Sequence, residues 1–172
     1  SGVNITRIEV WVTNKSGNYN QSRNLVAFMD LGENRRLANN SWVPNHTFDN
    51  PANASNNLLS TIKTEYPDAR DINKVTQAFE PLVAYGFDGG KDYEKVESAR
   101  LLSESEYTLN STLGYISIKS ALNADEVLAV AYEYTYNGQV YQVGEFSGDV
   151  TSTDNSLYLK MLKSTTVAPK LP

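Results

Sequence analysis

Hydrophobic and polar residues alternate at the start of the chain. In "ITRIEVWVT" (residues 5–13), Ile8, Val10 and Val12 alternate with polar or aromatic neighbours. This period of two predicts a β-strand with one buried face. The next apolar run, "NLVAFMDLG" (residues 24–32), lacks alternation and is typical of a strand covered on both faces. We expect these two strands to share a sheet.

The strongest alternation comes late in the chain, in "LGYISIKS" and "EVLAVAYEYTYNGQVYQV". Asn137-Gly138 between the last two alternating runs predicts a two-residue type I′ turn, because both central residues need positive φ. The resulting register pairs Tyr134 with Tyr141 and Tyr132 with Val143, and its continuation pairs residue 130 with residue 145. We therefore expect the inner tyrosine in the core and the tyrosines near the turn at the rim.

Helical spacing occurs only in the middle of the chain. Leu58, Leu59, Ile62 and Tyr66 predict one short helix, with Ser55 as a cap and Pro67 at its end. A second short helix is predicted by the same spacing of Ile72, Val75, Phe79 and Leu82, which ends at Pro81. The pattern assigns no regular element to residues 35–57, which are rich in Asn, or to residues 93–110.

The last strand, "SLYLKML", is expected to point Leu157, Leu159 and Met161 inward and Tyr158 and Lys160 outward. At least six strands with long connections then lie beside two helices. This pattern predicts a mainly β domain, an antiparallel β-sandwich of the jelly-roll or immunoglobulin-like type, with a small α insert. The 172 residues are long enough for one domain spanning residues 1–172.

Composition narrows the class of protein. A net charge of −5 with scattered basic residues argues against a nucleic-acid-binding face. The absence of Cys excludes disulfides and thiol catalysis. No apolar run approaches the roughly 18 residues of a membrane helix, and the first residues lack a secretory leader pattern. We expect a soluble piece of a much larger protein.

The sequence contains few residues in arrangements that could support catalysis or bind a metal ion. The only histidine, His46, lies in an Asn-rich stretch without a second ligand. Ser147 in "GEFSGD" does not match the spacing of a nucleophile elbow, so we expect a turn residue there. The acidic groups in "DGGKDYE" and "GDVTSTDNS" do not match an EF-hand and are more typical of turns. We therefore predict no enzyme activity, no cofactor and no metal site, and leave open whether a calcium ion or a glycan binds.

Aromatic residues leave two kinds of binding open. Trp11, Trp42 and the outward tyrosines could form a carbohydrate-binding platform, which is the alternative function, or the tryptophans could serve packing. If a protein partner docks instead, Asn-rich edges with Tyr19, Trp42 and Phe48 are the candidate contacts.

Three long segments carry a resemblance to a known family. They are "NITRIEVWVTNKSGNYNQSRNLVAFMDLGE", "DYEKVESARLLSESEYTLNSTLGYISIKSALNADEVLAVAYEYTYNGQVYQVGEFSGD" and "LYLKMLKSTTVAPKLP". They resemble the SprA (Sov) family of Bacteroidetes, the outer-membrane translocon of the type IX secretion system, which is also needed for gliding motility. The resemblance implies a soluble, non-enzymatic insert of that translocon, at the cell surface or on the periplasmic face. Its expected partners are other secretion and gliding proteins and secreted cargo proteins.

Overall fold

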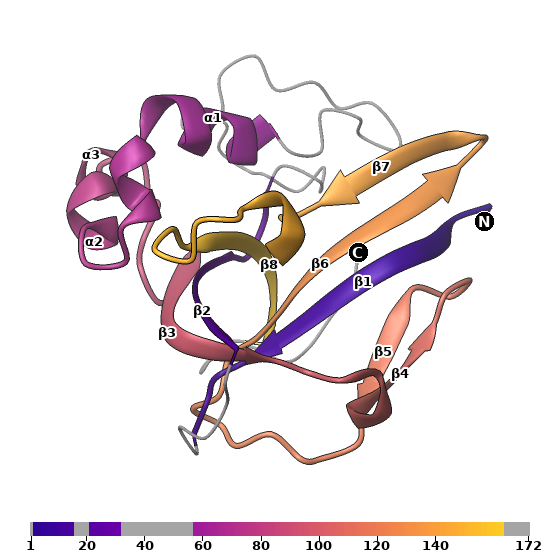
Figure 1. Ribbon diagram of the computed structural model, residues 1–172. Coiled ribbons are helices and arrows are strands. Elements are labelled where there is room, and N and C mark those ends of the chain that lie inside the picture. Colours follow the sequence, from indigo (N-terminus) through magenta and orange to yellow (C-terminus); the bar gives the residue numbers. More distant parts are fainter. Residues whose placement is uncertain (1, 16–20, 32–56, 164–172) are drawn as a thin grey trace.

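The computed structural model describes residues 2–15, 21–31 and 57–163, and most of them belong to short strands and short helices (Figure 1). The strands are β1 (Asn4–Val12), β2 (Ser22–Phe28), β3 (Tyr93–Leu101), β4 (Tyr107–Asn110), β5 (Tyr115–Ile118), β6 (Leu128–Tyr136), β7 (Gln139–Val143) and β8 (Leu157–Lys163). The α-helices are α1 (Asn57–Glu65), α2 (Val75–Ala78) and α3 (Glu80–Val83). Single 3₁₀ turns are η3 (Pro67–Arg70), η4 (Glu104–Glu106) and η5 (Ser147–Asp149). The prediction of a mainly β fold is confirmed.

The main sheet closes on itself. Its strand order is β1-β3-β2-β8-β6-β7, and an additional β1–β6 pairing joins five of these strands into a small barrel, with β7 extending from β6. All pairs are antiparallel except β2–β8. A closed sheet differs from the expected sandwich, whose two sheets face one another across a core. The difference arises because the first strand pairs with β6, more than a hundred residues later in the chain.

Alternation along the barrel strands separates two hydrophobic clusters. One contains Val26 of β2 together with the buried residues of the helices, and the other contains Leu25, Ala27, Ala129 and Leu159. Lys95 is exposed although it pairs with Val26 and so shares its face. The face carrying Val26 is therefore the outside of the barrel, partly covered by helices, and the alanine-rich cluster is the interior.

The helices lie together at one end of the molecule, beside the end of β2 and the start of β3 (Figure 1). α1 matches the first predicted helix. The second predicted helix is broken into α2 and α3 at Phe79, because Pro81 lacks the N–H that a continuous helix would need. Phe79 packs edge-on against Phe87 and Tyr93, with centroids 5.5 and 5.0 Å apart, and so anchors the broken helix to β3.

The predicted directions of the β8 side chains are confirmed, but the predicted continuation of the β6–β7 register is wrong. Tyr158 and Lys160 point to the outer face of the barrel as expected, but both are buried, since Tyr158 lies beneath Arg70 and the Lys160 ammonium reaches the carbonyl of Met29. Residue 145 does not pair with residue 130, because Gly144 at φ +76° ends β7 and turns Glu145 toward Tyr158.

Candidate interaction surface

The β6–β7 hairpin has the predicted turn. Asn137 and Gly138 have φ values of 49° and 76°, as a type I′ turn requires, and the register pairs Tyr134 with Tyr141 and Tyr132 with Val143. Tyr132 is only 4% exposed, whereas Tyr134 and Tyr141 are half-buried and stack with centroids 5.1 Å apart. The expected division between core and rim tyrosines is confirmed.

Three segments without a single charged residue meet at the end of this hairpin. They are residues 2–6, 107–118 and 134–143, in a chain of which 20% is charged. Asn4 pairs with Thr135, and the amide of Ile5 donates a hydrogen bond of 2.9 Å to the carbonyl of Ser111. The start of β1 thus joins the two hairpins (Figure 1). We call residues 2–6, 107–118 and 134–143 the uncharged end.

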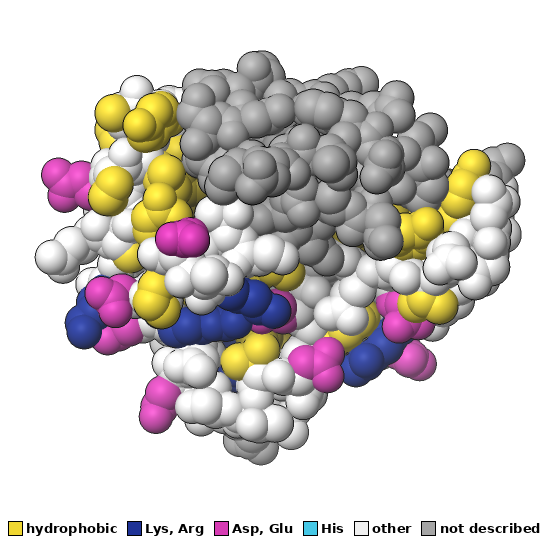
Figure 2. Space-filling model, turned by 90° about the horizontal axis from the view of Figure 1, so that it is seen from above, with side chains coloured by type: hydrophobic (Ala, Val, Ile, Leu, Met, Phe, Trp, Pro, Cys, Tyr) yellow, Lys and Arg dark blue, Asp and Glu magenta, His cyan; other side chains and the backbone are white. Residues whose placement is uncertain are grey.

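Large apolar side chains are exposed at the uncharged end. Leu113 is 72% exposed, Val140 62% and Tyr115 49%. Seen from above, the outermost described atoms of the β6–β7 hairpin are hydrophobic or neutral, and charged side chains lie further along the hairpin (Figure 2). Surfaces that bind proteins are depleted in Lys, Glu and Asp and enriched in Tyr. Tyr, Ser, Gly and Asn also dominate the binding loops of antibodies, because they contact a partner at low entropic cost.

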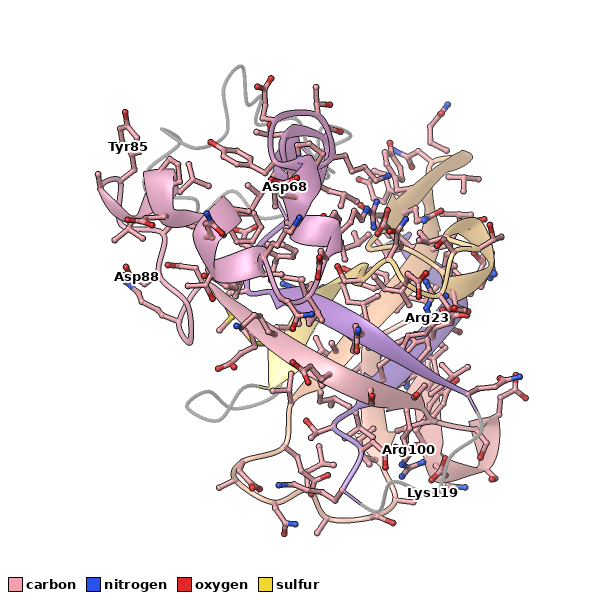
Figure 3. The ribbon with its side chains drawn as sticks, turned by 60° about the vertical axis from the view of Figure 1, so that its left-hand side comes forward. Arg23, Asp68, Tyr85, Asp88, Arg100 and Lys119 are labelled. Carbon is pink, nitrogen blue, oxygen red and sulfur yellow. The ribbon has the colours of Figure 1, made fainter. Side chains whose placement is uncertain are left out.

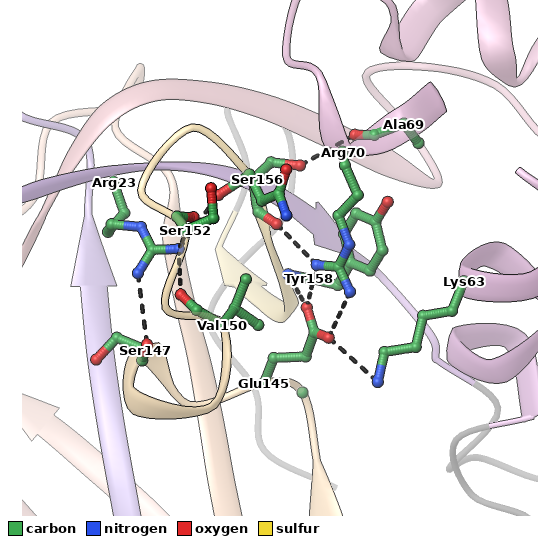
Figure 4. Close-up of polar contacts among 12 residues, drawn as sticks. Arg23, Lys63, Ala69, Arg70, Glu145, Ser147, Val150, Ser152, Ser156 and Tyr158 are labelled. Carbon is green, nitrogen blue, oxygen red and sulfur yellow. Dashed lines mark hydrogen bonds and ion pairs between the residues drawn. The ribbon is translucent and has the colours of Figure 1, made fainter. Parts of the chain in front are cut away.

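Buried charges occur instead beneath the helices (Figure 4). The Glu145 carboxylate accepts hydrogen bonds from both terminal nitrogens of Arg70, at 2.6 and 2.7 Å, and from the amide of Tyr158 at 3.0 Å. Lys63 of α1 is 3.2 Å from the same carboxylate. Burial by itself raises the pKa of Glu145, but the bonds from Arg70 and Tyr158 outweigh it and hold that pKa below its usual range. The network joins α1, η3 and β8.

Arg23 fixes the long loop between β7 and β8 in the same way. One guanidinium nitrogen donates to the carbonyls of Val150, Ser152 and Asn155 at 2.8, 3.2 and 3.2 Å. The other donates to Ser147 at 3.4 Å (Figure 4). Because four carbonyls of one loop depend on one side chain from β2, the loop is held against the barrel.

The candidate reactive residues have structural roles where they are described. Ser147 lies in η5, and its amide and hydroxyl both donate to the Glu9 carboxylate at 2.8 Å, which confirms a turn residue. In "DGGKDYE", the Asp92 carboxylate accepts the amide of Asp88 at 2.7 Å, again as in a turn. No group of three or more His, Asp or Glu side chains within residues 2–15, 21–31 and 57–163 could hold a metal ion.

The aromatic candidates separate into buried and undescribed residues. Trp11 is 2% exposed and lies in the barrel interior, so the packing interpretation is confirmed and Trp11 cannot form a sugar platform. Tyr19, Trp42, Phe48 and His46 lie outside the described residues. The sequence analysis did not identify the uncharged end, although the absence of charged residues from the three segments can be read from the sequence.

Comparison with known proteins assigns no relative. Neither a family model nor a curated protein matches the chain. Among the described helices, none is both long and apolar enough to cross a membrane.

Proposed function

We propose that this chain is a non-enzymatic interaction domain of a SprA-like outer-membrane translocon, and that it docks through the uncharged end. The uncharged end is the observation that carries the proposal. The resemblance of three long segments to the SprA family supports the proposal that the parent protein is such a translocon. That family acts in type IX secretion and gliding motility. The partners would be another protein of that machinery or a secreted cargo protein.

Physical chemistry favours docking at the uncharged end. Burying Leu113, Val140 and Tyr115 removes apolar surface from water, at about 25 cal/mol per Å². Because the three segments contain no charged side chain, docking carries no cost of desolvating a charge within them. The surface is also preorganised, because the turn at Asn137-Gly138 and the Tyr134–Tyr141 stack restrict it before a partner arrives.

The test uses the full-length parent protein in cells. A Leu113→Lys and Val140→Lys double variant places two charges on the uncharged end, and Val83→Lys is the matched control, because Val83 is also exposed (53%) but lies at the helical end. Cargo secretion and cross-linking to neighbouring proteins are measured in cells that assemble the translocon normally. We expect the double variant to lose cargo secretion, cross-linking or both. Val83→Lys should keep normal secretion and normal cross-linking. Normal secretion and normal cross-linking in the double variant would overturn the proposal.

A second arm tests the domain as a whole. This segment is replaced by a flexible linker that preserves assembly of the translocon. Loss of secretion in this arm, without loss in the double variant, would mean that the domain is needed but docks through another surface.

A further inference from the structure

The tip of the β6–β7 hairpin carries the one Asn-Gly pair in the sequence, Asn137-Gly138. Asparagine is a labile residue, because the backbone nitrogen of the next residue can attack the carbon of its side-chain amide. Every other asparagine of the chain is followed by a residue with a side chain, which hinders this attack. Glycine has no Cβ, so the nitrogen of Gly138 is the least hindered of these nucleophiles.

The structure leaves both reacting groups of this pair accessible. Asn137 and Gly138 are exposed, and the register pairs Tyr136 with Gln139, so the two turn residues have no ladder partner. The Gly138 amide donates to no backbone carbonyl of the described residues. The Asn137 side chain has no hydrogen bond with another residue in the part of the chain that the structure describes. Neither the attacking nitrogen nor the carbon that it attacks is therefore held by a competing bond.

Packing does not lock the turn either. A Cβ built on Gly138 has no atom within 4 Å, so the backbone can rotate there without displacing a neighbour. Asn110, in the other hairpin of the uncharged end, offers a contrast. Its side-chain oxygen accepts the Thr112 hydroxyl at 3.1 Å and the Leu113 amide at 2.9 Å, and Ser111 follows it. Asn110 is thus a restrained asparagine on the same surface.

We propose that Asn137 is a site of spontaneous deamidation in the folded protein. The Gly138 nitrogen gives up its proton to solvent and forms a bond to Cγ of Asn137, and the side-chain nitrogen leaves as ammonia. Water then adds to one carbonyl of the resulting succinimide and opens the ring. The product is aspartate, or isoaspartate where the chain continues through the side chain. One water is consumed and one ammonia is released, with no oxidation or reduction.

Either product places a negative charge on the uncharged end, since the pKa of an Asp side chain is about 3.9. Arg100 and Lys119 lie beside the β4–β5 hairpin (Figure 3), and the Arg100 guanidinium already binds the Glu106 carboxylate at 2.8 Å. A partner that docks at residue 137 would have to desolvate the new carboxylate. Deamidation should therefore weaken docking. This consequence rests on the function proposed for the uncharged end, whereas the reaction itself does not.

The chemical test uses the purified, folded chain. It is incubated at neutral and at mildly alkaline pH in water enriched in heavy oxygen, digested, and analysed by mass spectrometry for conversion at each asparagine. We expect Asn137 to react at least about tenfold faster than Asn110, which corresponds to a difference of about 1.4 kcal/mol in barrier, and faster still at the higher pH. Equal rates at Asn137 and Asn110 would overturn the proposal. So would conversion of Asn137 only after the chain is unfolded in urea, because the folded turn would then protect it.

Variants of the full-length parent test the consequence for docking. Asn137→Asp mimics the aspartate product and keeps the turn, because Asp-Gly also favours type I′ geometry. Asn137→Gly is the matched control, since Gly-Gly forms the same turn without a carboxamide or a charge. We expect Asn137→Asp to lose cross-linking at the uncharged end and Asn137→Gly to keep it. Equal cross-linking of these two variants, with loss in Leu113→Lys and Val140→Lys, would show that the end docks but is not controlled by deamidation. Normal cross-linking in that double variant would instead overturn the docking role and leave the chemical site standing.

Discussion

The helical end and the uncharged end are held together by different physical means. At the helical end, Arg70 and Glu145, 75 residues apart in sequence, form a buried ion pair that joins a 3₁₀ turn to the barrel. At the uncharged end, local hairpins and stacked rings hold the structure together, and the three segments contain no Asp, Glu, Lys, Arg or His. The helical end should therefore respond to pH and to single charge changes, whereas the uncharged end should respond to changes in turn geometry. The predictions below test this contrast from the largest effect on stability to the smallest.

Removal of Arg70 should have the largest effect. Arg70→Met leaves Glu145 buried, with a side chain 5% exposed and with Lys63 as its remaining ion-pair partner among the described residues. Breaking a buried pair destabilises a protein by about 3–5 kcal/mol, and the remaining lysine should place the value near the lower end. Urea unfolding measures the change in free energy.

The control for this variant is Lys15→Met, which removes an ion pair with Asp125 whose side chains are 49% and 64% exposed. We expect a change within about 0.5 kcal/mol there. Equal effects of the two variants would mean that burial of the pair at the helical end is unimportant for stability.

Acid should act through the same network. Because the pKa of Glu145 in the folded protein lies below its unfolded value, the stabilisation is present above the unfolded pKa, about 4.3, and is lost as the pH falls through the folded pKa. Glu145→Gln should lower the unfolding free energy at pH 7 by about 1.5–3 kcal/mol, since hydrogen bonds to a charged group are weakened.

The diagnostic measurement is the slope of stability against pH. Below about pH 4.5 the wild type should lose stability more steeply than Glu145→Gln, whose amide does not titrate. Glu94→Gln should differ from Glu145→Gln at pH 7. It should leave the unfolding free energy unchanged or raise it, because burial raises the pKa of Glu94 and so disfavours its charged form. Parallel pH profiles for wild type and Glu145→Gln would contradict this account of the helical end.

The turn at the uncharged end should give the next largest effect. Gly138 has φ +76°, and a Cβ built there has no atom within 4 Å, so backbone strain alone penalises a larger residue. Gly138→Val should destabilise the chain by about 1 kcal/mol or more, at every pH between 4 and 8. Gly138→Asn is the control, since Asn tolerates this conformation, and it should lose clearly less. Thermal unfolding of both variants checks the order.

Local patterns predicted the local structure at both ends. Alternation and Asn137-Gly138 sufficed for the β6–β7 hairpin, because a two-residue turn fixes the register of its own strands. β3 was not predicted, since its buried residues Tyr93, Val96 and Ala99 are three apart, as in a helix. Ser98, at φ 55°, interrupts the alternation near a register shift opposite β2, which explains part of this spacing.

The uncharged end depended on contacts that no local pattern contains. The uncharged end forms only because β1 pairs with β6, which brings Asn4 to Thr135. Closure of the barrel has the same origin, and so it was not expected.

The smallest effect on stability should come from two exposed valines, one at each end. Val140 and Val83 are 62% and 53% exposed, so replacing either by lysine should change the unfolding free energy by no more than about 0.5 kcal/mol. Their effects on binding should differ. In the full-length parent, Val140→Lys should reduce cross-linking at the uncharged end, and Val83→Lys should not. Equal loss of cross-linking in the two variants would mean that the uncharged end is not the docking surface.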